Sequence, residues 1–225
     1  MIDFTLYLIT DRTLFSTHHL LFGAVEEALR AGVRAVQLRE KDLPVRGQLE
    51  MAYRMRELTV KYDTKLLINE SVDIALCVEA DGVHLGQSGI PISAVKTIVK
   101  EGFLIGASTH SVAEAVIAEK EGADFITFGP LRETPSKIRY GTPLGMKSIR
   151  EVRERVSLPI FGIGGIKQEH VREIMHLGAT GVALISGILG ETHIKAATEG
   201  YLNRLRQLPF IPSPEGGEGG RGEPL

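Results

Sequence analysis

Short, continuously apolar segments alternate with longer amphipathic segments about eight times along the chain, and this alternation restricts the fold more than any other feature. Because the short segments are apolar throughout, rather than at every second residue, we expect strands that are covered on both faces. Strands joined by helices pair in parallel through right-handed crossovers. The sequence therefore predicts an α/β fold with strands at 5–9, 35–38, 65–68, 82–85, 103–106, 125–128, 159–163 and 181–185.

Four junctions between a predicted helix and the next strand share small residues, at 32–36, 79–83, 121–125 and 177–182. Glycine there is expected to supply the left-handed backbone conformation that ends a helix. Four junctions in register favour a closed barrel over an open sheet, and no Gly-x-Gly-x-x-Gly motif follows the first strand. We predict a single-domain (β/α)8 TIM barrel over residues 1–208. Residues 209–225 are rich in Gly, Pro and Glu, which predicts a disordered tail.

Composition excludes several classes of function. The 26 Lys and Arg residues against 28 Asp and Glu residues give a net charge of −2, so no basic field predicts nucleic-acid binding. No apolar run is long enough to span a membrane, and the N-terminal segment lacks the basic start of a signal peptide. Cys77 is the single cysteine, which excludes an internal disulfide; we expect a buried thiol and a cytoplasmic protein. The oligomeric state stays open, a homo-oligomer included.

Polar residues that follow the second strand are candidates for a ligand site, because a barrel places its active site at the carboxyl ends of its strands. Period-two alternation sends Gln37, Arg39 and Lys41 to one face. A guanidinium and an ammonium on that face suit phosphate oxygens. The alternative is a surface ion-pair cluster with Glu40 and Asp42.

The ends of the third and fifth strands carry further candidates. In Asn69-Glu70, the carboxylate is a candidate ligand for Mg²⁺ together with substrate phosphates, although both residue types also begin helices well. Ser108 and His110 are candidates for acid–base or hydrogen-bonding roles. The alternative for this segment is a helix cap formed by Thr109 or Ser111.

The last three strands are followed by a long loop and two glycine-containing turns. Long loops in compact domains are usually functional, and Thr134, Ser136 and Lys137 in the loop at 129–141 would suit a flap over an anion. Gly165, in the turn after strand seven, and Ile185-Ser186, after strand eight, stand where barrels commonly bind phosphate through backbone N–H groups. The alternatives are an exposed loop without a ligand and glycines that only permit tight turns.

Taken together, these motifs resemble the thiamine-phosphate synthase family from Leu6 to about Leu205. The resemblance implies that an aminopyrimidine methyl pyrophosphate condenses with a thiazole phosphate, with Mg²⁺ and without a redox cofactor, so that the partners are small phosphorylated molecules. The motifs that carry it are Tyr7-Leu8-Ile9-Thr10-Asp11, Val36-Gln37-Leu38-Arg39-Glu40-Lys41, Leu67-Ile68-Asn69, Asp81-Gly82-Val83-His84-Leu85-Gly86-Gln87, Gly106-Ala107-Ser108-Thr109-His110-Ser111, Phe128-Gly129-Pro130, Thr134-Pro135-Ser136-Lys137, Ile163-Gly164-Gly165-Ile166 and Ile185-Ser186.

The family's site residues carry over motif by motif. Those implied for the pyrimidine pyrophosphate are Gln37, Arg39, Lys41, Asn69, Ser108 and Lys137. Those implied for the thiazole phosphate are Thr134, Ser136, Gly165, Ile185 and Ser186. The implied catalytic residues are Arg39, Lys137, Ser108 and His110, and the implied metal ligand is Glu70.

Two departures from the family pattern concern the metal. Glu70 stands where the family's synthases usually have Asp, and Gly89 stands where they carry a second Asp. These departures keep two alternatives open beside the synthase. One is a thiazole tautomerase of the same superfamily, which would use His110 as an acid–base group, and the other is a non-catalytic binder of thiamine intermediates.

Overall fold

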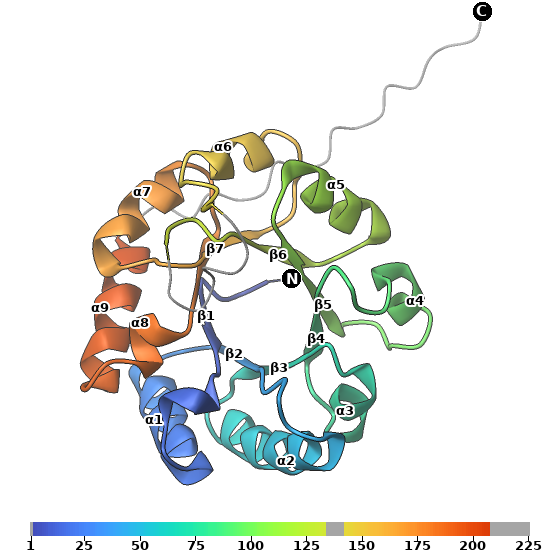
Figure 1. Cartoon of the computed structure of the whole chain (residues 1–225), viewed down its shortest axis with the longest axis vertical. Helices are drawn as coiled ribbons and strands as arrows, with labels where there is room; N and C mark the ends of the chain where they lie inside the picture. Colours follow the sequence, from blue (N-terminus) through green and yellow to red (C-terminus); the bar gives the residue numbers. More distant parts are fainter. Residues whose placement is uncertain (1, 134–141, 208–225) are drawn as a thin grey trace, which may run out of the picture.

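Eight parallel strands close into a barrel in the order β1-β2-β3-β4-β5-β6-β7-β8, and helices form a ring around it (Figure 1). The computed structural model describes residues 2–133 and 142–207. The α/β barrel predicted from the alternation of segments is therefore confirmed. The strands are β1 (Leu6–Ile9), β2 (Ala35–Leu38), β3 (Lys65–Asn69), β4 (Gly82–Leu85), β5 (Leu104–Thr109), β6 (Phe125–Phe128), β7 (Ile160–Ile163) and β8 (Gly181–Leu184).

Each strand is followed by helical structure that returns the chain to the amino end of the barrel. Within the described residues, no helix has the length and apolar character that crossing a membrane requires. The helical elements are η1 (Arg12–Leu14), α1 (His18–Ala31), α2 (Val45–Lys61), α3 (Val72–Cys77), α4 (Ile92–Lys96), α5 (Val112–Glu121), α6 (Ser148–Arg153), η3 (Gln168–His170), α7 (Val171–His176), α8 (Ser186–Leu189) and α9 (Ile194–Arg206).

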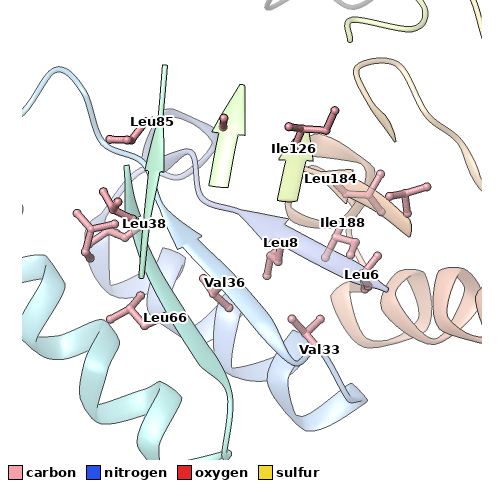
Figure 2. Close-up of a cluster of buried hydrophobic side chains, with 14 of the residues drawn as sticks. Leu6, Leu8, Val33, Val36, Leu38, Leu66, Leu85, Ile126, Leu184 and Ile188 are labelled. Atoms are coloured by element: carbon pink, nitrogen blue, oxygen red, sulfur yellow. The ribbon is translucent and has the colours of Figure 1, made fainter. Parts of the chain in front are cut away.

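The strands are buried on both faces, as their composition predicts. Outward-facing residues such as Leu6, Leu8 and Val36 belong to the core between barrel and helices (Figure 2). Inside the barrel, the rings of Tyr7 and Phe125 lie 5.5 Å apart, edge to face, within a cluster of buried side chains. Because side chains fill the interior, a ligand has room only at the ends of the strands.

Three of the four predicted helix ends contain a glycine with a left-handed backbone: φ is 111° at Gly32, 91° at Gly122 and 103° at Gly178. The fourth junction differs, because Glu79 takes the left-handed conformation there with φ of 51°. Gly82 lies within β4 instead, where a Cβ would lie 2.3 Å from the backbone oxygen of Leu104. This glycine is required by the close approach of β4 to β5.

The predicted burial of Cys77 is wrong, because its side chain is exposed. The apolar run from Ile74 to Val78 forms the C-terminal part of helix α3 and its cap. In a helix only the residues on one face reach the core, and here these are Ile74, Ala75 and Val78. Cys77 lies on the other face, where continuous apolar sequence gives no burial.

Candidate active site

The carboxyl ends of all eight strands meet at one rim, because the barrel is closed and every strand pairing is parallel. Candidates that follow β2, β3, β5, β7 and β8 therefore share this rim. In the strand order, β3 and β7 lie on opposite sides of the barrel. The rim accordingly has two parts, one at β2–β4 and one at β7–β8.

Gln37 lies inside the barrel at the end of β2 and is 1% exposed. Its amide Nε2 donates a hydrogen bond to the hydroxyl of Tyr7 at 3.0 Å. Burial raises the pKa of the Tyr7 phenol, which stays neutral at physiological pH. One N–H of the Gln37 amide is thus hydrogen-bonded to Tyr7 inside the barrel. The carbonyl oxygen and the second N–H of this amide are available to a ligand.

Glu40 joins the ends of β1 and β2 from the side opposite to Gln37. Its carboxylate accepts from the Thr10 hydroxyl at 2.6 Å and from the Arg12 N–H at 3.0 Å. The same Thr10 hydroxyl accepts a hydrogen bond from the backbone N–H of Arg39 at 2.9 Å. Burial raises the pKa of Glu40, and the two hydrogen bonds oppose that shift. From the sequence, Glu40 was considered only as part of a surface ion-pair cluster. The hydrogen bonds by which it holds the ends of β1 and β2 together beneath Arg39 were not predicted.

Lys41 forms an ion pair with Glu70 across the ends of β2 and β3, with Nζ 2.9 Å from Oε1. Glu70 has a left-handed backbone, with φ of 61°, and its N–H donates to the backbone oxygen of His84 at 2.9 Å. Its carboxylate lies over Gly86, where a Cβ would come within 2.6 Å of Oε1. Together with Asn69, these two side chains line a cavity of about 90 Å³.

Two carboxylates, those of Glu40 and Glu70, line this cavity. The Glu40 carboxylate already accepts hydrogen bonds from Thr10 and Arg12, so Glu70 is the candidate ligand for magnesium. Within residues 2–133 and 142–207, no three His, Cys, Asp or Glu side chains are grouped to hold a metal ion. The turn at Gly86–Gly89 supplies no carboxylate. Magnesium is often held by one or two carboxylates, substrate phosphates and water. The donor set therefore fits magnesium when phosphate oxygens complete the coordination.

His84 is a buried polar residue that sequence reasoning did not assign to a role. Its Nε2 lies 3.1 Å from the Ser108 hydroxyl and 3.2 Å from the Thr127 hydroxyl. Burial, and to a lesser degree the charges of Arg39 and Lys41, lower the pKa of His84 to about 3. The imidazole is therefore neutral and orients Ser108. The available signal was a single polar residue within the apolar strand β4.

His110 lies at the rim and also belongs to the loop that begins α5. Ser111 caps the helix by accepting from the Glu114 N–H at 3.2 Å, and the N–H of His110 donates to the Glu114 carboxylate at 2.6 Å. The ring Nδ1 is 2.5 Å from the backbone oxygen of Gly129. Because a carbonyl oxygen only accepts, Nδ1 of His110 carries the proton in this contact.

The turns after β7 and β8 lie side by side. The Tyr201 hydroxyl donates to the backbone oxygen of Ile166 at 3.0 Å, and a Cβ on Gly187 would lie 3.5 Å from that same oxygen. Gly165 has φ of 63°, a conformation that glycine adopts readily. Ser186 is the first residue of α8, so its backbone N–H has no partner within the helix. Exposed N–H groups of this kind bind phosphate.

A second cavity, of about 390 Å³, opens beside Gly165 and is lined by Arg132, Lys167 and His170 among others. The Lys167 N–H donates to Nδ1 of His170 at 3.0 Å. Burial, followed by the charge of Arg132, lowers the pKa of His170. Sequence reasoning missed Arg132 and Lys167, whose only signal was their position beside the predicted loop and turn. The candidates Thr134, Ser136 and Lys137 lie outside the described residues, as does the predicted tail at 209–225.

Comparison with known proteins gives a consistent result. The sequence profile of the family described as "Thiamine monophosphate synthase" matches residues 6–188. A Geobacter sulfurreducens protein named "Putative thiamine-phosphate synthase" is 50% identical over 84% of this chain and 89% of its own length. The thiamine-phosphate synthase of Clostridium novyi is 39% identical over 90% of this chain and 98% of its own length. The solved structure of thiamine phosphate pyrophosphorylase from Pyrococcus furiosus is 37% identical, with a TM-score of 0.81 over 91% of this chain and 96% of that one.

Proposed function

The chain belongs to the thiamine monophosphate synthase family, and from this premise we propose that it joins a pyrimidine methyl pyrophosphate to a thiazole phosphate. The products are thiamine phosphate and pyrophosphate. The observation that supports the proposal is that two groups of candidate anion-binding residues lie on one rim. Arg39 and Lys41 lie near β2 and β3, and the turns at Gly165 and Ser186 lie near β7 and β8. A reaction between two phosphorylated substrates needs two such regions.

The bond that breaks joins the pyrimidine methylene carbon to a pyrophosphate oxygen, which leaves with the electron pair. The thiazole nitrogen then forms the new bond to that carbon. Cationic groups that hold the leaving pyrophosphate lower the barrier, because negative charge grows on it as the bond breaks. We assign this role to Arg39, Lys41 and Lys137, and a hydrogen-bonding role on the same group to Asn69.

The pyrimidine ring is assigned to the polar groups inside the rim. Gln37 is fixed by Tyr7, and Ser108 is fixed by the neutral His84, so both offer oriented hydrogen bonds to a flat heterocycle. Rigid support of this kind keeps the methylene carbon in line with its leaving group.

The thiazole phosphate is assigned to the opposite part of the rim. Backbone groups of Gly165, Ile185 and Ser186 would bind its phosphate, with the hydroxyls of Thr134 and Ser136 contributing from the loop. Glycine is required at 165, since a Cβ there would lie 2.6 Å from the backbone oxygen of Glu133, which packs against this turn. Binding on this side directs the thiazole nitrogen toward the β2–β4 side.

Magnesium at Glu70 would supply further positive charge to the leaving pyrophosphate. The remaining stabilisation of that charge comes from the chain's own cations.

Incubation with both substrates and Mg²⁺, with pyrophosphate and thiamine phosphate measured separately, tests the proposal. We expect equal amounts of the two products. Arg39→Ala should lose most of the activity, and Lys65→Ala, which removes a charge at the amino end of β3, should keep it. Isomerisation of the thiazole phosphate without pyrophosphate release would instead identify a tautomerase that uses His110. Binding without either reaction would identify a non-catalytic binder.

A further inference from the structure

Lys41 and Glu70 are assigned to different ligands, pyrophosphate and magnesium, and yet the structure joins them to each other. Their side chains are 47% and 36% exposed, so the ion pair can open without disturbing the core. We propose that Lys41 occupies the metal-binding oxygen of Glu70 until a pyrophosphate group draws it away. On this proposal, which rests on the proposed function, the metal ion binds poorly to the free enzyme and well only together with the anion.

The backbone of Glu70 is held in place, and its carboxylate oxygen Oε1 has neighbours on two sides. Its backbone is fixed by a hydrogen bond to the His84 backbone oxygen and by a left-handed conformation. Its Oε1 lies against Gly86 on one side and 2.9 Å from the Lys41 ammonium on the other. The long, flexible Lys41 side chain is therefore the partner that moves. Glu70 stays in place for whichever cation binds it.

The other carboxylate that lines the cavity, that of Glu40, is held by hydrogen bonds from Thr10 and Arg12 and does not replace the Oε1 paired with Lys41. The neighbouring turn is closed by the Gly89 N–H, which donates to the Gly86 backbone oxygen at 3.1 Å, and its residues carry no negative charge. Among the described residues, no further acidic, histidine or cysteine side chains gather into a metal site. A divalent ion that approaches the free enzyme thus meets a carboxylate that is already paired with Lys41, and the ammonium group of Lys41 repels it.

Pyrophosphate changes both conditions at once. Its negative charges offer Lys41 a stronger partner than a single carboxylate, and its oxygens supply the hard ligands that magnesium needs beside Glu70. Each ligand then favours the binding of the other, and this coupling is necessarily reciprocal. Lys41 is the residue through which the two ligands interact, because its ammonium moves from the Glu70 carboxylate toward the anion and leaves Oε1 to the metal ion.

Binding of Mn²⁺ alone, measured by electron paramagnetic resonance in buffer without phosphate, tests the proposal on the intact chain. Lys41→Met removes the ammonium and keeps the length of the side chain. We expect it to tighten Mn²⁺ binding about tenfold relative to the wild type. The matched control is Lys65→Met at the opposite end of β3, where Lys65 is 43% exposed and lies 3.6 Å from Asp81. The control should change the affinity less than about twofold.

Three results would overturn the proposal. The first is an Mn²⁺ affinity that is unchanged or weaker in Lys41→Met, with folding verified by circular dichroism. The second is equal tightening in Lys65→Met, which would show a general effect of net charge. The third is tightening that persists in Lys41→Met/Glu70→Gln, which would place the ion elsewhere. The synthase assay separates this inference from the proposed function, because a wild type that forms thiamine phosphate keeps its function whichever way the Mn²⁺ titration falls.

Discussion

Replacing Thr10 by valine tests the contact that joins the ends of β1 and β2 beneath Arg39. The Thr10 hydroxyl is buried and makes two hydrogen bonds, donating to Glu40 at 2.6 Å and accepting from the Arg39 N–H at 2.9 Å. Valine keeps the branched shape and removes both. We therefore expect a folded variant whose two strand ends are joined less firmly.

The expected loss of stability is about 3 kcal/mol, because a hydrogen bond to a charged group contributes about 1.5–3 kcal/mol and an unpaired buried N–H costs about 1–3 kcal/mol. The lower values apply here, since Arg39 is only half-buried and water can reach it. Thr198→Val is the matched control. Thr198 is also 0% exposed, but its hydroxyl donates to a carbonyl of its own helix, that of Ile194, at 2.8 Å. Its loss should cost less than about 1 kcal/mol.

The effect of Thr10→Val should depend on pH in a defined direction. Burial raises the folded pKa of Glu40 above 4.5, so its contribution to stability is present below that value and is lost as the pH rises through the folded pKa. The Thr10 hydroxyl opposes the shift, so the variant has a still higher folded pKa. Thr10→Val should therefore be more destabilising at neutral pH than at pH values below 4.5.

Urea unfolding followed by circular dichroism measures both effects, and the chain contains no tryptophan for fluorescence. A loss below about 1 kcal/mol at neutral pH would contradict the value derived from the two hydrogen bonds. A loss equal to that of Thr198→Val would show that the carboxylate adds nothing to the contact.

Five further variants test other parts of the site. Arg39→Ala should lower kcat/KM by about 30- to 1000-fold, and Lys137→Ala by a similar factor, since each variant removes a positive charge that stabilises the leaving pyrophosphate. Wild-type turnover in both variants would refute these roles. Gly89→Asp, at a residue outside the left-handed region, should lower the Mg²⁺ concentration needed for half-maximal activity, and an unchanged titration would count against a missing ligand. In the range from pH 6.5 down to about 3, the unfolded chain protonates His84 and the folded protein does not. His84 should therefore lower the free energy of unfolding by about 1.4 kcal/mol for each pH unit of acidification, and acid unfolding of His84→Gln should lack this contribution. Gly106→Ala should destabilise by about 3 kcal/mol in urea, since its Cβ would lie 2.5 Å from Nδ1 of the His84 ring, and a loss within error would show that the ring moves aside.

The fold was predictable because its signal is repeated. Each βα unit shows a short apolar segment followed by an amphipathic one, and the strands β2, β4 and β6 begin and end at the predicted residues. The error concerned the burial of one side chain. Cys77 was expected to be buried because its neighbours in the sequence are apolar, but it lies on the exposed face of the short helix α3. In so short an apolar run, periodicity does not show which residues face the core.

The candidate site was predictable in its location and less so in its contacts. The positions of Arg39, Lys41 and Glu70 follow from the ends of strands and need no coordinates. The pairing of Lys41 with Glu70, and the burial of Glu40 beneath Thr10, were not predicted. Alternation along a strand says which side chains share a face, but it does not say which neighbour from another strand each will contact.

Those contacts nevertheless follow a rule that the fold supplies. Gln37 binds Tyr7 and Glu40 binds Thr10, each 30 residues away, and Glu70 binds Lys41 29 residues away. The strands β1, β2 and β3 begin at Leu6, Ala35 and Lys65, so the separation of the contacts equals the length of one βα unit. In a parallel barrel, equivalent positions of successive units lie beside each other at the rim. Once the closed barrel is established, residues one unit apart become the first pairs to examine, and the pairing of Lys41 with Glu70 could have been inferred before the coordinates.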